Sequence, residues 1–165
     1  MQVDIREGSI LEADTDAIAN PADAEGKMEA GLASMITEAA GADIAQQVAA
    51  KAPIAVGAAV VTEGGRTRFK AIIHVPTMPV GAASADAKQV GQATRAALKA
   101  TEDGGFKSVA LPGFGTGRGG VSPEVAAAEM FAAIRSFSSS PIERVVLIDT
   151  SSDIVAAWTA CIDCF

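Results

Sequence analysis

The sequence is most informative at residues 111–122, which run Leu111-Pro112-Gly113-Phe114-Gly115-Thr116-Gly117-Arg118-Gly119-Gly120-Val121-Ser122. Glycine costs conformational entropy on folding, so the five glycines of this loop need a reason. Glycine permits positive φ, so that successive N–H groups can converge on an anion, and it lets backbone approach a phosphate beside a helix N-terminus. The loop therefore predicts a phosphate-bearing ligand, with a merely flexible turn as the alternative.

Two common nucleotide-binding motifs do not account for this loop. A P-loop requires Gly-Lys followed by Ser or Thr, and the loop contains no lysine. The run 115–120 matches GxGxxG, but Asp149, the acid at the end of the next expected strand, lies well beyond the roughly 20 residues expected. Too little chain follows for the remaining strands of a dinucleotide-binding fold.

Strand-like and helix-like stretches alternate along the chain with short connections, which is typical of an α/β sandwich. Gly41 divides an Ala-rich stretch into two expected helices, Gly64-Gly65 predicts a hairpin turn, and Ser122 with Pro123 predicts a helix start. No repeat or linker divides the chain, so we expect one domain over residues 1–165. The expected strands are residues 2–6, 16–20 (stopping at Pro21), 58–62, 69–75, 108–111 and 144–149, and the expected helices are 31–51, 86–102, 123 onward and 153 onward.

Composition and charge argue against several classes of protein. Hydrophobic residues make up 49% of the chain and charged residues 20%, which argues against disorder. The net charge is −7 and the 13 Lys and Arg are scattered, whereas direct nucleic-acid binding needs clustered basic residues. No apolar run reaches the roughly 18 residues of a bilayer span, and residues 1–4 do not begin a signal peptide. We therefore expect a soluble, cytoplasmic protein without a membrane partner.

The cysteines and the histidine give little support for a metal site. Cys161 and Cys164 form a CxxC pair that closes the last expected helix, whereas a redox pair usually opens one. His74 is the only histidine, so Cys and His alone cannot supply four zinc ligands within one chain. We interpret the cysteines as structural thiols and expect neither a metal nor a cofactor.

Four separated segments resemble the macrodomain family. Residues 7–10 (EGSI) and 16–23 (DAIANPAD) are similar to that family's GDI…DAIVNAAN. Residues 29–36 (EAGLASMI) resemble its first ligand loop, GGGV-x-GAI, and residues 71–74 (AIIH) resemble its xIIH strand. Residues 111–122 resemble hPxxGTGxGGxP, the phosphate loop of one branch, and the overall likeness is to members that process ADP-ribose-1''-phosphate. The order and spacing agree over almost the whole chain.

The resemblance implies a three-layer α/β/α sandwich with a mixed, about six-stranded sheet, and ADP-ribose or a related nucleotide at the strand ends. The phosphate loop would hold the diphosphate and the distal ribose, while the first loop would close over the other side. Ser9 and Ile10 would face the adenine, and residues 20–23 would lie near the distal ribose. The implied ligand-binding residues are Ser9, Ile10, Asn20, Asp23, Ala30, Gly31, Leu32, Gly115, Thr116, Gly117, Arg118 and Gly119.

The sequence also departs from the family pattern. Ser9 replaces the Asp that reads adenine, and a hydroxyl accepts from the amino group without charge assistance. Asp23 replaces the second Asn of the family's pair and loses the amide donor. Gly31 alone remains of three glycines, and Ala33 stands where hydrolysing members often carry Asp. No aromatic residue follows the last strand to stack on adenine, and Ile154 would be an apolar substitute.

Three functions remain open at this point. The first is a module that binds ADP-ribose or a derivative, with or without weak ADP-ribosyl hydrolase activity. The second is a committed hydrolase of ADP-ribosylated protein or of a small ADP-ribose metabolite, which includes an ADP-ribose-1''-phosphate phosphatase. The third is a chain that binds another nucleotide or has lost binding.

Three ionisable residues have two interpretations each. Asp23 is the candidate catalytic residue because it could orient or deprotonate a water, but an Asp in a loop often only bonds to backbone. His74 could act as a general base, although a lone His on a buried strand is more often structural. Arg118 could contact the diphosphate or face solvent.

Overall fold

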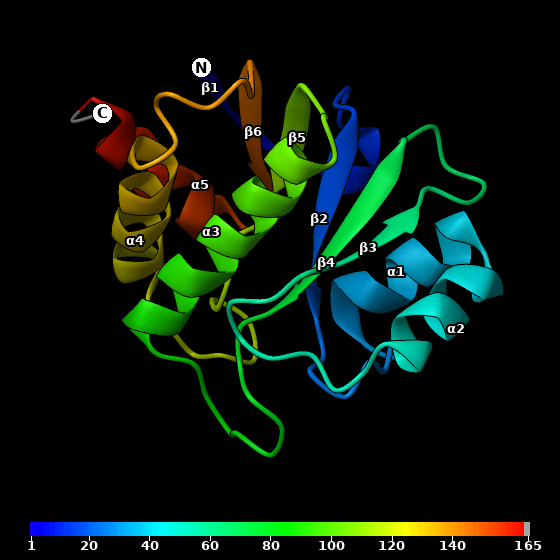
Figure 1. Cartoon of the computed structure of the whole chain (residues 1–165). Coiled ribbons are helices and arrows are strands. Elements are labelled where there is room, and N and C mark those ends of the chain that lie inside the picture. Colours follow the sequence, from blue (N-terminus) through cyan, green and yellow to red (C-terminus); the bar gives the residue numbers. More distant parts are fainter. Residues whose placement is uncertain (164–165) are drawn as a thin grey trace.

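A computed structural model describes residues 1–163 of the chain (Figure 1). Its six-stranded sheet has the order β1-β6-β5-β2-β4-β3. Neighbouring strands are parallel except β3 and β4, which form the predicted antiparallel hairpin. The mixed sheet with helices between its strands confirms the predicted α/β sandwich. The strands are β1 (Gln2–Glu7), β2 (Ala17–Ala22), β3 (Val60–Glu63), β4 (Ala71–Pro76), β5 (Ser108–Leu111) and β6 (Arg144–Asp149).

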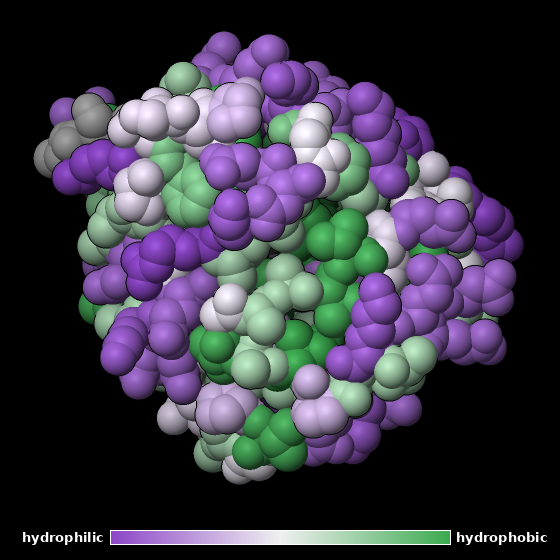
Figure 2. All heavy atoms as spheres, in the orientation of Figure 1, coloured by the Kyte–Doolittle hydropathy of each residue, from purple (hydrophilic) through white to green (hydrophobic). Residues whose placement is uncertain are grey.

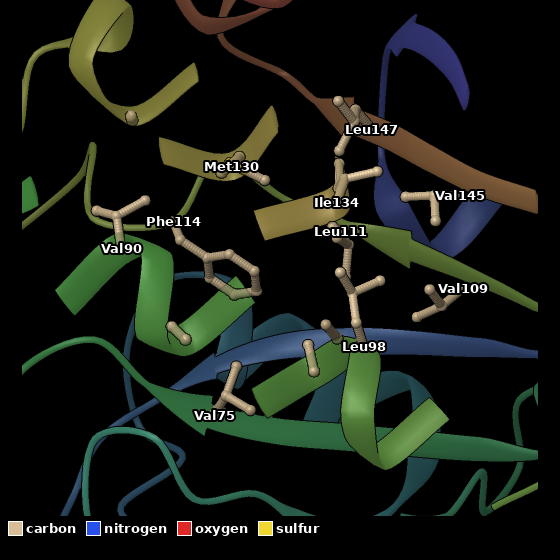
Figure 3. Close-up of a cluster of buried hydrophobic side chains, with 14 of the residues drawn as sticks. Val75, Val90, Leu98, Val109, Leu111, Phe114, Met130, Ile134, Val145 and Leu147 are labelled. Carbon is tan, nitrogen blue, oxygen red and sulfur yellow. The ribbon is translucent and has the colours of Figure 1, made fainter. Parts of the chain in front are cut away.

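Helices cover both faces of this sheet, so the central strands are buried on both sides (Figure 1). α3, α4 and α5 enclose one cluster of buried side chains, here called the large core, in which Leu98, Met130 and Leu147 pack (Figure 3). The 3-10 helix η1 with α1 and α2 enclose a second cluster, the small core. The helices are η1 (Ile10–Glu12), α1 (Gly31–Ala40), α2 (Ala42–Ala50), α3 (Ala87–Asp103), α4 (Pro123–Arg135) and α5 (Ser152–Ile162).

The alternation of strand residues explains why two cores form. Val145 and Leu147 belong to the large core, whereas Val146 and Ile148 between them belong to the small core. Successive side chains of a strand point to opposite faces, so a continuous apolar run such as β6 fills both clusters. The sheet is therefore held from both sides.

Local signals begin the helices where the sequence predicts them. The Ser122 hydroxyl accepts a hydrogen bond from the Val125 amide at 3.3 Å and Pro123 is the first residue of α4, as predicted. At α3, Asp86 and Gln89 form a capping box in which each side chain accepts from the other residue's amide. Gly41 has φ of 110° and separates α1 from α2.

The prediction that the second strand stops at Pro21 is wrong. β2 continues through Pro21 to Ala22 and pairs with β4 along its whole length. Its pairing with β5 ends at Ile18, so one side of β2 has no ladder partner where Pro21 stands. A strand that is open on one side tolerates a residue without an N–H group.

Charged and polar side chains surround a patch of apolar residues on the face shown in Figure 2. Within residues 1–163, no helix is long and apolar enough to cross a membrane. The same residues contain no cluster of three or more His, Cys, Asp or Glu side chains suited to a metal ion. Cys161 is a free, half-exposed thiol near the end of α5, whereas the other residue of the CxxC pair, Cys164, lies outside the described residues.

Candidate functional site

The topology singles out one place on the sheet edge. The connection after β5 leads to α4 on the large-core face, whereas the connection after the neighbouring strand β2 leads to α1 on the small-core face (Figure 1). In open α/β sheets, ligands bind outside the carboxyl ends of two strands whose connections separate in this way. We call this place the switch point, and two segments border it: residues 23–30 after β2 and the glycine loop, residues 113–120, after β5.

The glycine loop is fixed from beneath and from both sides. Phe114 is fully buried and inserts its ring into the large core near Val90 and Met130 (Figure 3). The Gly113 amide donates to Asp149 Oδ2 at 3.0 Å, and the Ala85 amide donates to the Gly119 carbonyl at 2.9 Å. The loop thus has a shape set by its neighbours before any ligand arrives.

Most glycines of this loop are required by the protein itself. Gly115 has φ of 77°, and a Cβ there would lie 2.7 Å from Val90 Cγ2. A Cβ on Gly119 would lie 2.6 Å from the Gly115 carbonyl oxygen, and Gly120 has φ of 70°. At these positions the backbone conformation, the packing or both exclude any residue with a side chain, whether or not a ligand is bound.

Gly117 is different from the other glycines of the loop. Its φ is not in the left-handed region, no atom lies within 4 Å of a Cβ built on it, and it is exposed. Within residues 1–163, the amides of Gly117 and Arg118 donate no hydrogen bond. Nothing in the protein itself requires glycine at this position. The close approach of a ligand to the exposed amides would require it.

Arg118 is the only cation in the glycine loop. Its side chain is exposed and forms no ion pair within the part of the chain that the structure describes. Thr116, beside it, turns its hydroxyl inward to donate to the Gly113 carbonyl at 2.9 Å. Arg118 is thus available to an anion, whereas the Thr116 hydroxyl stabilises the loop.

The segment after β2 brings two of the implied binding elements to the switch point. Asp23 is half-buried, and its Oδ1 accepts from the Glu25 amide at 2.7 Å. The start of α1 has no side-chain cap at Ala30, and Gly31 after it has φ of 58°. Ala30 and Gly31 are exposed, while Leu32 is half-buried against the small core. Uncapped amides at a helix N-terminus favour an anion nearby.

Asn20 belongs to a buried network rather than to the surface. Its Nδ2 donates to His74 Nδ1 at 3.0 Å and lies 3.6 Å from Met28 Sδ, while His74 Nε2 lies 2.9 Å from the Thr62 hydroxyl. Because Nδ1 accepts, Nε2 carries the ring proton and donates to Thr62, whose hydroxyl lies 3.1 Å from the Glu63 carbonyl. Asn20 and His74 are fully buried.

This network decides between the two interpretations of His74. Both ring nitrogens have partners, and burial lowers the pKa of His74 to about 4, so the ring is neutral at pH 7. The ring links β3, β4 and β2 across the small-core face. These contacts favour a structural histidine over a general base.

Ser9 and Ile10 follow β1 at the same edge of the sheet. The Ser9 hydroxyl oxygen caps η1 by accepting from the Leu11 amide at 3.3 Å, and Ser9 is half-buried. The Ile10 side chain is 3% exposed in the small core, so its backbone rather than its side chain is the part that could meet a ligand. The Gly8 amide donates to the Asp149 carbonyl at 2.9 Å, which ties this segment to the end of β6.

The expectation that Ile154 stands in for a stacking aromatic residue is wrong. Ile154 is fully buried in the large core, and its Cγ1 lies 2.9 Å from the position of a Cβ on Gly113. It supports the glycine loop from below and presents no surface to a base.

Asp149 is a residue of the site that sequence reasoning treated only as a motif acid. Its Oδ2 accepts from the Gly113 amide and its Oδ1 accepts from the Ser151 amide at 2.9 Å. The carboxylate thereby joins the glycine loop to the start of α5. Its place as the last residue of an otherwise apolar strand was the signal that could have indicated this role.

A hollow of about 430 Å³ lies away from the switch point, between β3 and α3. Ala59, Val61 and Phe106 line it with apolar surface, and Lys99 at its rim is paired with Asp103 at 2.7 Å. Among the described residues that line it, there is neither a free cation nor a glycine-rich backbone segment of the kind found in the glycine loop. The switch point is therefore the better candidate for a nucleotide site.

Known proteins agree with this architecture. The Macro domain family model matches residues 19–130, which is more than half of the chain. An uncharacterized protein of Aquifex aeolicus is 44% identical over 158 residues, covering 96% of each chain. An uncharacterized protein of Mycobacterium tuberculosis is 30% identical over 162 residues, and this chain spans only 45% of that longer protein.

Solved structures show the same fold. The Trypanosoma brucei macrodomain in complex with ADP-ribose superimposes with a TM-score of 0.88 at 17% identity, covering 98% of this chain and 69% of that one. The Oceanobacillus iheyensis macrodomain with ADP gives a TM-score of 0.86 at 21% identity, covering 96% and 88%. At these identities the likeness concerns the fold. Together with the family match, it shows that this chain belongs to the Macro domain family.

Proposed function

We propose that this chain binds ADP-ribose, or a close derivative of it, at the switch point. The observation that carries the proposal is Gly117, a glycine that the protein's own conformation and packing do not require. Its amide and that of Arg118 have no acceptor within residues 1–163, and the Arg118 guanidinium is free beside them. A diphosphate supplies oxygens for those amides and charge for that cation.

The other side of the ligand meets residues 20–32 in this proposal. The uncapped amides of Ala30, Gly31 and Leu32 favour the negative end of the ligand. Asp23 offers a carboxylate oxygen that can accept from ribose hydroxyls, whereas Asn20 is fully buried. The base then lies toward Ser9 and Ile10, and Gly115, Thr116 and Gly119 shape the phosphate loop.

Two structural relatives support the choice of ligand. The Trypanosoma brucei macrodomain is known in complex with ADP-ribose and with ADP, and the Oceanobacillus iheyensis macrodomain with ADP. Because these proteins are only distantly similar in sequence, their residue contacts with the ligand are not transferred to this chain. The ligand is therefore tested directly.

Isothermal titration of the purified chain with ADP-ribose, with ADP and with adenosine tests the proposal. ADP-ribose and ADP are expected to bind and adenosine to bind far more weakly, because adenosine has no phosphate for the glycine loop. Absence of any binding heat with millimolar ADP-ribose would refute the proposal. Equal affinity for adenosine and ADP would show that the glycine loop does not hold the diphosphate.

A hydrolase is the second candidate function, and one observation favours it. Asp23 is half-buried beside the switch point, and within residues 1–163 its carboxylate is engaged only at Oδ1, by the Glu25 amide. Its second oxygen is available to orient a water near the distal ribose. Release of free ADP-ribose from an ADP-ribosylated protein, and of phosphate from ADP-ribose-1''-phosphate, tests the two candidate reactions.

The Asp23→Asn variant separates binding from catalysis. It keeps an oxygen that can accept from the Glu25 amide but removes the charge. A hydrolase that depends on Asp23 loses turnover in this variant while keeping its affinity for ADP-ribose. Unchanged turnover in Asp23→Asn would exclude Asp23 as the base, and absent turnover in the unaltered chain would leave the binding function alone.

A further inference from the structure

One edge of the sheet is left open at β3. This strand is the last in the sheet order, and it pairs with β4 in an antiparallel ladder. Among the described residues, the backbone of residues 60–63 forms no backbone hydrogen bond outside that ladder. A ladder on one side uses about half of a strand's N–H and C=O groups, so the other half points away from β4. The edge can therefore accept a further strand.

The sheet face beside this edge is also uncovered. α3 packs mainly against β4 and β5, and the hollow of about 430 Å³ separates it from β3. A second hollow of about 340 Å³ continues the first along α3, since both are lined by Gly57, Ala96 and Lys99. Val61 lies in the first hollow and is 39% exposed. The apolar patch of Figure 2 lies in the region between α3 and β3 of Figure 1. Apolar surface with a polar rim is typical of a contact with another protein chain.

This groove carries opposite charges at its two ends. Arg95 lines it beside Gly57, just before β3, whereas Glu63 is the last residue of β3. Both side chains are exposed, and neither forms an ion pair within residues 1–163. Lys99 is already paired with acids of its own helix, and Glu129 on α4 lies near Arg95 but forms no ion pair with it. One free cation and one free acid therefore remain, at opposite ends of β3.

A two-fold axis at Val61 makes this surface complementary to itself. If two β3 strands pair antiparallel about that axis, Val61 of one copy lies opposite Val61 of the other, because directly opposite residues of a sheet share a face. Two residues further on, Glu63 lies opposite Ala59 of the second copy, at the end of the groove where Arg95 stands. The symmetry repeats this arrangement on the other side of the axis, so each copy offers its acid to the cation of the other.

We propose that this chain forms a two-fold dimer through β3, in which the two sheets join edge to edge and the two grooves face each other across the axis. A second copy is the partner because the surface itself carries both members of each ion pair. Other registers fit less well, since a shift of one residue at the axis puts Val61 opposite either the small Ala59 or the charged Glu63. The interface lies away from the switch point, so the proposal does not depend on the proposed function.

Sedimentation velocity over a range of chain concentrations tests the proposal with two charge reversals, Arg95→Glu and Glu63→Arg. The unaltered chain is expected to dimerise. Each reversal brings like charges together on both sides of the axis and is expected to weaken the dimer by at least about tenfold. An equimolar mixture of the two variants is expected to dimerise as well as the unaltered chain, because the charges of one copy are then opposite in sign to those of the other.

Lys88→Glu is the matched control. It makes the same change of charge on the exposed side of α3, but outside the groove, and is expected to leave the dimer intact. An unaltered chain that stays monomeric at millimolar concentration overturns the proposal. A dimer that survives both single reversals uses another surface and overturns it too, as does a mixture of the two variants that stays monomeric. None of these measurements involves a nucleotide, so each of these results leaves the proposed function standing.

Discussion

Replacing Gly117 with alanine is expected to stabilise the protein and to weaken its ligand binding at the same time. No atom lies within 4 Å of the new Cβ and the backbone φ is outside the left-handed region, so the folded state gains no strain. Alanine restricts the unfolded chain, which stabilises such positions by about 0.4–1 kcal/mol. For a chain of this size, that raises the thermal midpoint by about 1–4 °C.

The neighbouring position gives the opposite sign and serves as the internal comparison. Alanine at Gly115 would need a φ of 77° and would bring its Cβ within 2.7 Å of Val90 Cγ2. A left-handed conformation costs about 1–2 kcal/mol and a forced core contact adds to it, so we expect a loss of about 2–3 kcal/mol. The thermal midpoint then falls by about 4–12 °C.

Differential scanning calorimetry and titration with ADP-ribose measure both effects on the same samples. Gly117→Ala is expected to lose at least tenfold in affinity, about 1.4 kcal/mol, because in the proposed site the methyl group would compete with a phosphate oxygen for the same space. Ser139→Val, an exposed change in the loop before β6 at the opposite end of the strands, is the control and should leave affinity unchanged. A midpoint for Gly117→Ala as low as that of Gly115→Ala, or an unchanged affinity, would refute the reasoning.

Three further predictions concern single side chains. The pKa of His74 is about 4 in the folded protein and 6.5 in the unfolded chain. The contribution of the neutral ring to the free energy of unfolding is therefore complete above pH 6.5 and is lost as the pH falls toward 4, by about 3 kcal/mol in all. Urea unfolding should show that the free energy of unfolding falls between pH 7 and pH 5, and His74→Gln should remove most of this fall, since no other histidine is present. If the variant shows the same fall, His74 is not its cause. Asp149→Ala removes the acceptor of two amides and should lower the free energy of unfolding by about 2–4 kcal/mol in urea titrations, with weaker ADP-ribose binding; unchanged stability would mean that these amides find water instead. Arg118→Ala should change stability by no more than about 0.5 kcal/mol, since the side chain is exposed, but should weaken ADP-ribose binding and reduce its dependence on salt. The same affinity and salt dependence in this variant would show that Arg118 only faces solvent.

The fold followed from local sequence signals because these signals agreed with each other. The apolar run of β6, the cap at Ser122 with Pro123, and the break at Gly41 each describe a short segment whose conformation its own residues determine. The prediction failed at Pro21, where the decisive fact is non-local. Whether a proline ends a strand depends on which neighbours the strand has, and β5 stops pairing with β2 just before it.

The candidate site could be predicted less completely, for a related reason. Glycine content indicated the glycine loop as a candidate site, but it did not distinguish Gly117 from Gly115, because that difference depends on where Val90 lies in space. The anchoring role of Asp149 depends on two amides from different loops. Ile154 was misassigned because the register of a helix against its core decides which residues reach the surface.

The switch point has a consequence for how such a site can change. The glycine loop rests on the large core through Phe114 and Ile154, whereas the segment that ends at Gly31 rests on the small core. The two borders of the site thus belong to different layers of the molecule, and the sheet separates them. In the proposed site, substitutions in residues 23–31 would alter which sugar or linkage is accepted without disturbing the side chains that hold the glycine loop in shape. The segment after β2 is therefore free to vary in sequence while the glycine loop after β5 keeps its shape.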